Sequence, residues 1–204
     1  LIFQILCANI ALNGLTNTHC LQVGLGSNKG EANIPNIDLN KPINTGAFTF
    51  KVPTQGEIVP IVPLDEIGLK VLHFLKLDIE GFELDALKGS KTTIEKTRPV
   101  MYMENSGDRP DYAAEQSHEL INYLFEIGYQ VYWHWPQVYN SENYFRNDEN
   151  VFRNKAKRLQ IVSSNMLCFP KEWDISVEGL LAANHDDDPY TAIKRWNLLR
   201  KSNV

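Results

Sequence analysis

Two apolar stretches of strand length, joined by a helical pattern, constrain the fold of this chain most. HFLKLDI at 73–79 and PVMYMEN at 99–105 are almost continuously apolar until their last residues. Between them, GFELDALKG at 81–89 has the apolar spacing of a helix and a closing Gly89. A strand, a helical crossover and a second strand build a parallel sheet with helices on both faces. The sequence therefore predicts a three-layer α/β domain with a mostly parallel sheet.

Further elements are expected on both sides of this unit. Helical periodicity covers residues 2–12 and 114–127. Strand composition covers residues 19–25, 129–135 and 159–170, with a break near Ser163 and Ser164.

The remaining segments give weaker patterns. Residues 46–53 alternate as an edge strand would, and residues 58–68 resemble a connector that leads to a short helical turn. Asp188 and Pro189 predict the start of a C-terminal helix, because Asp caps a first turn and Pro suits its first position.

Length and composition indicate one domain over residues 1–204, since 204 residues with 43% hydrophobic content can bury one substantial core. A net charge of -5 argues against sequence-independent binding to nucleic acid, which needs clustered Lys and Arg. The apolar runs are too short or too interrupted by proline for a membrane span of about 20 residues. Cys7, Cys20 and Cys168 lack the spacing of a metal or redox pair, so we expect buried reduced thiols in a cytoplasmic protein.

Carboxylates end both strands of the central unit. Asp78 closes the first strand, Glu80 follows in the turn, and Glu104 closes the second strand. Ligands of open α/β sheets bind beyond the carboxyl ends of the strands. We therefore expect Asp78, Glu80 and Glu104 to accept hydrogen bonds, hold a cation or act as a base. Glu83 lies in the first helical turn, where capping or solvent exposure explains it as well.

A metal is a second possibility at this position. If the two strands are neighbours, Asp78, Glu104 and Asn105 offer the hard oxygen ligands that Mg²⁺ prefers. Acid–base or hydrogen-bonding roles fit the same residues, and the sequence favours them over a metal. The HDDD run at 185–188 also resembles a metal cluster, but a helix start with solvated acids is the expected structure.

His134 is a third candidate base, with an ordinary histidine of an aromatic strand as the alternative. It lies in YWHWPQVY, whose aromatic side chains suit a lid or a platform for a sugar ring. Residues 143–152 are expected to close part of an acceptor pocket.

A glycine-rich stretch, VGLGSNKGEA at 23–32, contains G-x-G-x-x-x-G after a predicted strand. A dinucleotide site needs a helix directly after such glycines, whereas Pro35 and Pro42 interrupt any helix here. A nicotinamide-dependent enzyme is therefore a minor alternative. The glycines can still let an adenine ring approach the backbone.

The segment LKLDIEGFELDALKG resembles the hallmark K-[IL]-D-[IV]-E-G-x-E-x-x-x-L-x-G of the FkbM family of S-adenosylmethionine-dependent methyltransferases. VPLDEIGLKVLHF before it, and RPVMYMEN, ENYFRNDENVF and SSNMLCFP after it, extend the resemblance. FQILCANIALNG is similar to the helix that follows the second strand in that family. The resemblance covers most of the chain and is most specific over residues 75–105.

The resemblance implies a Rossmann-like class I methyltransferase fold with the methyl donor lying across the strand ends. It implies methyl transfer to oxygen on a sugar, glycan or other small metabolite. Asp78 then matches the acid near the methionine part of S-adenosylmethionine or the acceptor, and Glu80, Gly81 and Glu83 match the rest of that turn. Gly24 and Leu25 correspond by fold position to residues that line the adenine.

The chain departs from the family at its beginning. The first strand, its glycine-rich loop and the acid that binds the ribose hydroxyls are absent, because Leu1 corresponds to a position just after that acid. We therefore expect an N-terminally truncated methyltransferase domain whose isolated 204 residues bind the cofactor weakly. A non-catalytic binding domain on the same scaffold is the main alternative. The acceptor and the oligomeric state are not determined by the sequence.

Overall fold

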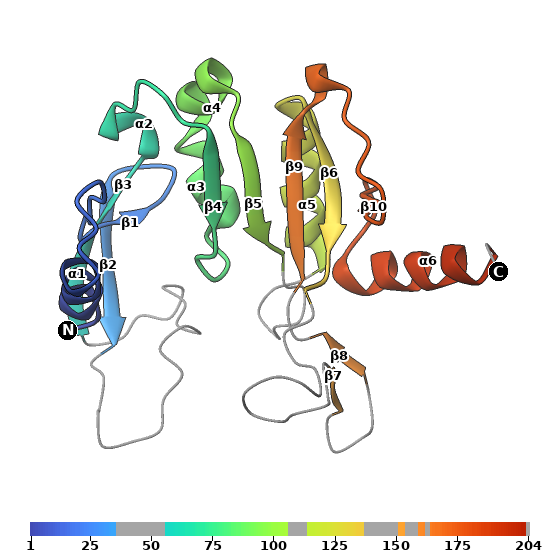
Figure 1. The fold of residues 1–204 in the computed structure, drawn as a ribbon, viewed down its shortest axis with the longest axis horizontal. Helices are drawn as coiled ribbons and strands as arrows, with labels where there is room; N and C mark the ends of the chain where they lie inside the picture. Colours follow the sequence, from blue (N-terminus) through green and yellow to red (C-terminus); the bar gives the residue numbers. More distant parts are fainter. Residues whose placement is uncertain (36–55, 106–113, 137–150, 154–158, 162–163, 203–204) are drawn as a thin grey trace.

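The computed structural model of the chain describes residues 1–35, 56–105, 114–136, 151–153, 159–161 and 164–202 (Figure 1). The predicted edge strand at 46–53 and residues 143–150 of the predicted pocket segment lie outside the described residues. The helices are α1 (Ile2–Leu12), α2 (Leu64–Ile67), α3 (Glu83–Lys88), α4 (Lys91–Thr97), α5 (Ala114–Glu126), the 3-10 turn η2 (Lys171–Trp173) and α6 (Pro189–Ser202).

The strands form three sheets. They are β1 (Gly24–Leu25), β2 (Gly30–Pro35), β3 (Gly56–Val62), β4 (Phe74–Leu77), β5 (Val100–Glu104), β6 (Tyr129–His134), β7 (Val151–Arg153), β8 (Leu159–Ile161), β9 (Asn165–Pro170) and β10 (Leu181–Ala182).

The largest sheet has the strand order β10-β6-β9-β5-β4. The predicted strand–helix–strand unit is present, since β4 and β5 pair in parallel with Leu77 opposite Met103. The expectation of a mostly parallel sheet is wrong, because β9 lies between β5 and β6 and is antiparallel to both. β10 adds a further antiparallel pair at the edge. The apolar pattern of β9 predicted a strand but carried no information about its direction.

A separate three-stranded sheet has the order β1-β3-β2. Its central strand β3 covers residues that were predicted to be a connector because of their prolines. Pro60 is tolerated because it lies where β2 is the only described strand partner of β3, so its missing N–H interrupts no second ladder. Directly after Gly30 the chain forms β2 and not a helix, which removes the helix N-terminus that a dinucleotide site requires.

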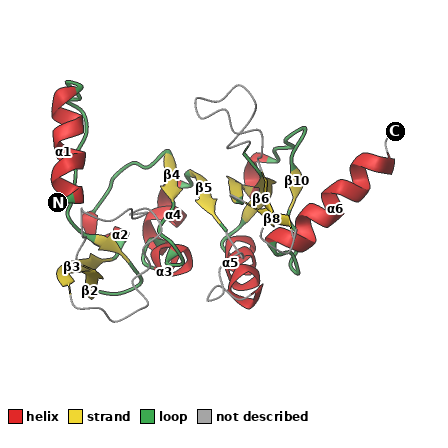
Figure 2. Ribbon diagram, turned by 90° about the horizontal axis from the view of Figure 1, so that it is seen from below, coloured by secondary structure: helices red, strands yellow, loops and turns green. Residues whose placement is uncertain are grey.

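The core lies on one face of the five-stranded sheet. Met101, Met103, Met166 and Trp133 are fully buried there, together with Leu120, Ile121 and Leu124 of α5. Figure 2 shows α3 and α5 on the same side of this sheet. Alternate residues of β5 and β6 point to the other face and stay half-buried. That half-buried face, and not the core face, is where polar side chains are available for function.

Helix α4 was not predicted, because its sequence KTTIEKT has little apolar periodicity. It begins after Ser90, whose side chain makes no capping hydrogen bond. Asp65 of α2 supplies the cap from a distance, since its carboxylate accepts hydrogen bonds from the backbone N–H of Thr92 (3.0 Å) and Thr93 (2.8 Å). A tertiary contact therefore determines where α4 starts.

The two terminal helices match their predictions. α1 has no buried residue, although Ile2 and Leu6 are apolar and only about half-exposed. α6 begins as expected, with the Asp188 carboxylate accepting from the backbone N–H of Tyr190 and Thr191. None of the described helices is long and apolar enough to cross a membrane.

The acids at 185–188 are not all solvated, contrary to expectation. Asp187 is buried, where it accepts hydrogen bonds from the Trp133 indole (3.1 Å) and the backbone of Asn184 (2.8 Å) and pairs with Arg195. It therefore ties β6 to α6.

The cysteines also differ from the expectation in part. Cys168 is buried as expected, but Cys7 and Cys20 are half-buried. The chain turns back beside α1 after the helix ends (Figure 2), and burial, followed by the neighbouring Cys7, raises the pKa of the Cys20 thiol.

Candidate functional site

A buried acid, Glu83, fixes the backbone of the turn between β4 and α3. Glu80 and Gly81 both have left-handed backbones, with φ of 56° and 88°, a conformation that is unfavourable for a residue with a side chain. The Glu83 carboxylate accepts hydrogen bonds from the backbone N–H of Ile79 (3.1 Å) and Gly81 (2.9 Å). Glu83 is only 2% exposed, so it is neither solvated nor free to bind a ligand. It acts as a clamp on the turn.

Burial has an electrostatic consequence for this clamp. It raises the pKa of Glu83 above the ordinary 4.5, and this effect outweighs the backbone hydrogen bonds that favour the ionised form. The charge of Asp78 raises the pKa further.

The clamped turn brings three carboxylates together. Carboxylate oxygens of Asp78, Glu80 and Glu104 lie within 4.8 Å of one another, and we call these residues the acidic trio. The parallel register of β4 and β5 explains this, because Asp78 follows Leu77 and Glu104 follows its partner Met103. Asp78 is exposed and the other two are half-buried. The convergence of Asp78 with Glu104, which the sequence suggested for neighbouring strands, is therefore present.

Lys76 forms an ion pair with the acidic trio, with 2.7 Å between its ammonium nitrogen and the Asp78 carboxylate. Both side chains of that pair are about half-exposed, so the pair contributes at most about 1 kcal/mol. Three carboxylates that converge in this way favour a ligand that carries positive charge or donates hydrogen bonds.

The oxygen ligands of the acidic trio also have the chemistry of a divalent-cation site. Asn105, which was expected to join them, does not. It is fully buried, continues the strand through a hydrogen bond from its backbone N–H to Ser164, and lies on the opposite face from Glu104. Its side-chain amide donates to the Met166 sulfur (3.4 Å). The strand alternation that brings Glu104 to the site removes Asn105 from it.

Two further side chains lie on the half-buried face. Tyr102 and His134 are joined by a hydrogen bond of 2.8 Å between the phenol oxygen and Nδ1. His134 and Glu104 both pair with Asn165 of β9, so they occupy one row across three strands. Burial raises the pKa of Tyr102, and the nearby charge of Asp78 adds to that effect. The phenol therefore stays protonated near neutral pH.

Tyr102 was not among the predicted site residues. Its position two residues before Glu104 on the same strand was the available signal, because residues i and i+2 share a face. The aromatic stretch around His134 divides between the two faces. Trp133 is in the core and stacks against Trp135, with 5.8 Å between ring centroids, so Trp133 cannot form an exposed sugar platform.

The predicted cofactor residues Gly24 and Leu25 lie in β1, in the three-stranded sheet, and not in the acidic trio. Leu25 packs against the core. The loop that follows them reaches α3, where Ser27 donates to Asp85 (3.4 Å) and the Gly26 backbone touches Gly89. The loop therefore contacts α3, the helix that follows the acidic turn between β4 and α3.

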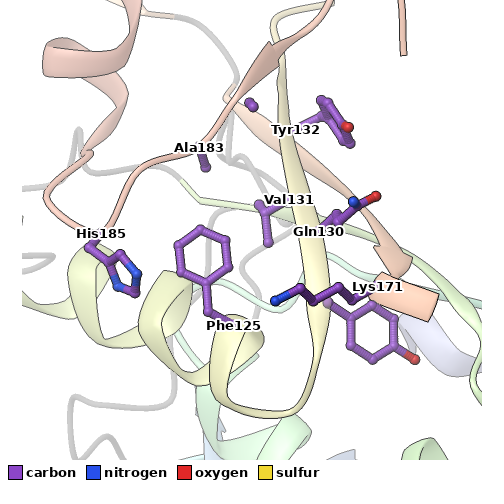
Figure 3. A pocket seen from close by; sticks show the side chains of 9 residues that line it. Phe125, Gln130, Val131, Tyr132, Lys171, Ala183 and His185 are labelled. Carbon is purple, nitrogen blue, oxygen red and sulfur yellow. The ribbon is translucent and has the colours of Figure 1, made fainter. Parts of the chain in front are cut away.

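A pocket of about 380 Å³ lies at the other end of β6, away from His134 (Figure 3). His185 and Phe125 meet there edge to face, with 4.7 Å between ring centroids. Other residues around it include Tyr129, Gln130, Val131 and Lys171. None of the predicted site residues lines it.

Comparison with known proteins gives one match. A family model described as the Methyltransferase FkbM domain matches residues 2–131, which include the acidic turn and Glu104 and end just before His134. No curated protein and no solved structure matches the chain.

Proposed function

Because the chain belongs to the FkbM methyltransferase domain family, we propose that it functions as an S-adenosylmethionine-dependent methyltransferase. We propose a hydroxyl oxygen of a sugar or other small metabolite as the methyl acceptor. The observation that carries this proposal is the acidic trio at the carboxyl ends of β4 and β5, which is where ligands of open α/β sheets bind.

The chemistry of the trio fits the proposed donor. When bound, S-adenosylmethionine supplies a methyl group on a positively charged sulfonium, and its amino acid part carries an ammonium. Carboxylates that converge within 4.8 Å favour such positive groups. By the family resemblance, Asp78 lies near the methionine part or the acceptor, and by fold position Gly24 and Leu25 line the adenine.

The trio also suits the acceptor. Methyl transfer needs the acceptor oxygen aligned near attack distance and a group that takes the hydroxyl proton. We assign proton acceptance to a carboxylate oxygen of Asp78 or Glu104, and hydrogen bonding to the acceptor to Glu80. A divalent cation held by the same oxygens would be an alternative means of activating the hydroxyl.

Titration calorimetry with S-adenosylhomocysteine tests this proposal. The titrations would be made with and without Mg²⁺. We expect S-adenosylhomocysteine to bind. Failure to bind would contradict the proposal and favour a non-catalytic binding domain, whereas a requirement for Mg²⁺ would assign the trio to a metal.

A further inference from the structure

The hydrogen bond between Tyr102 and His134 determines which nitrogen of His134 carries a proton. A tyrosine phenol is protonated near neutral pH, because its ordinary pKa is about 10. Its proton needs an acceptor, and Nδ1 of His134 is the one that the described part of the chain provides, at 2.8 Å. A phenol that donates to Nδ1 requires that nitrogen to be unprotonated, which places the proton of the neutral ring on Nε2.

The position of His134 gives this tautomer a function. His134 and Glu104 lie in one cross-strand row, two strands apart, which places their backbones roughly 10 Å from each other at the usual strand spacing. The same half-buried face therefore presents hydrogen-bond acceptors at the acidic trio and one N–H donor at His134. A hydroxylated molecule that spans the face can donate to the first and accept from the second.

We propose that Tyr102 is a positioning residue that holds His134 in its Nε2–H tautomer, and that His134 donates a hydrogen bond to an oxygen of the methyl acceptor. The second part rests on the proposed function. It reassigns His134, which the sequence suggested as a base, to substrate binding, and it leaves the proton to the carboxylates. It also selects acceptors with several oxygens, such as sugars or other polyols, over molecules with a single hydroxyl.

The tautomer is measured by ¹⁵N NMR of histidine-labelled protein at about pH 8.5, roughly two units above the ordinary histidine pKa. The chain has 5 histidines, and the His134→Gln variant identifies the His134 signals. We expect a pyrrole-like Nε2 and a pyridine-like Nδ1 that is shifted by its hydrogen bond. Tyr102→Phe should move Nδ1 toward the position of a nitrogen without such a bond.

Tyr132→Phe is the matched control. Tyr132 lies on the same face as Tyr102, but its hydroxyl donates to the backbone oxygen of Ile175 (2.7 Å), so removing it should leave the His134 nitrogens unchanged. A protonated Nδ1 in the wild type would overturn the proposal, and so would His134 signals that Tyr102→Phe does not move.

The binding role is tested separately by kinetics once an acceptor is in hand. Tyr102→Phe should raise KM for the acceptor by about twofold to tenfold, the loss expected for one neutral hydrogen bond, with little change in kcat. His134→Gln, which keeps a donor, should retain more activity than His134→Ala. A fall in kcat with unchanged KM would overturn the substrate-binding role. An inactive wild type would overturn the proposed function, while the NMR result would still decide the tautomer.

Discussion

At the scale of single residues, the acids of the DIEGFE segment have separate physical tasks. Asp78 and Glu80 present their carboxylates at the strand ends, whereas Glu83 is buried and holds the backbone of the turn. Gly81 supplies a left-handed backbone that most other residues resist. The segment therefore has a structural role as well as a chemical one.

Replacing Glu83 by Gln tests the clamp. A Gln side chain is isosteric with the protonated acid, which also accepts through one oxygen, so we expect Glu83→Gln to cost at most about 1 kcal/mol in the free energy of unfolding under mildly acidic conditions. The folded-state pKa of Glu83 is raised, so its stabilising contribution is full below 4.5 and declines as the pH rises through the raised pKa. The stability of the wild type relative to the variant should therefore fall with rising pH.

Urea unfolding from about pH 4 to about pH 8 measures this difference. Glu95→Gln is the control, because Glu95 is an exposed acid of α4 whose described ion pair with Lys91 is long, at 3.9 Å. A wild type that gains stability relative to Glu83→Gln with rising pH would contradict the assignment of the raised pKa.

Sequence reasoning reached part of this site for a definite reason. Asp78 and Glu104 interrupt apolar strands, and an acid in that position is expensive unless it is used. Glu83 looked like an ordinary first-turn acid, because its partners are backbone N–H groups that no sequence pattern reveals. Tyr102 was hidden by its membership of an apolar strand.

At the scale of elements, the unpredicted helix α4 depends on Asp65. Asp65→Ala should lower the free energy of unfolding by about 0.5–2 kcal/mol, the usual cost of losing an N-cap. Although burial opposes it, the hydrogen bonds from Thr93 and Thr92 lower the pKa of Asp65 below 3.8. The contribution should therefore be full above 3.8 and be lost as the pH falls through the lowered pKa.

Chemical denaturation at several pH values measures the effect, with Glu66→Ala as the control. Glu66 is the neighbouring acid of α2, and its ion pair with Lys29 is exposed, so its removal should cost at most about 1 kcal/mol. Equal losses for both variants would contradict the assignment of Asp65 as the N-terminal cap of α4.

The junction between α3 and α4 depends on Gly89. Its backbone conformation is ordinary, but an added Cβ would collide with the carbonyl of Gly26, which is backbone and cannot rotate away. Gly89→Ala should cost about 1–3 kcal/mol, as expected for overpacking. Gly30→Ala is the control, since nothing lies near the position of its Cβ. A thermal shift no larger for Gly89→Ala than for Gly30→Ala would contradict this packing.

Elements with strong periodicity were predicted, and those set by tertiary contacts were not. Helices α1, α5 and α6 and strands β4, β5, β6 and β9 follow from apolar spacing and caps. Strand β3 was missed because its prolines suggested a connector. Strand β10 has 2 residues, and α4 is defined by a cap from another helix, so neither leaves a local signal.

At the scale of the whole molecule, the site depends on how strands meet. The parallel pair β4 and β5 gathers the acidic trio, and the antiparallel strand β9 brings His134 of β6 onto the same face. A sequence pattern predicts strands but not their order in a sheet, so the link between His134 and the acids could not be foreseen. The face combines the turn after β4 with strands β5, β9 and β6, so no single motif contains all of its residues.

The most direct test of the central claim is transfer of a radiolabelled methyl group from S-adenosylmethionine to a small-molecule extract, catalysed by the protein. The variants are Asp78→Asn and the exposed control Glu95→Gln. Because Asp78 is exposed, Asp78→Asn should change the free energy of unfolding by no more than about 0.5 kcal/mol, yet lower transfer by about 10²-fold or more. Glu95→Gln should transfer at the wild-type rate. Full transfer by Asp78→Asn would contradict the claim that the acidic trio is where this protein works.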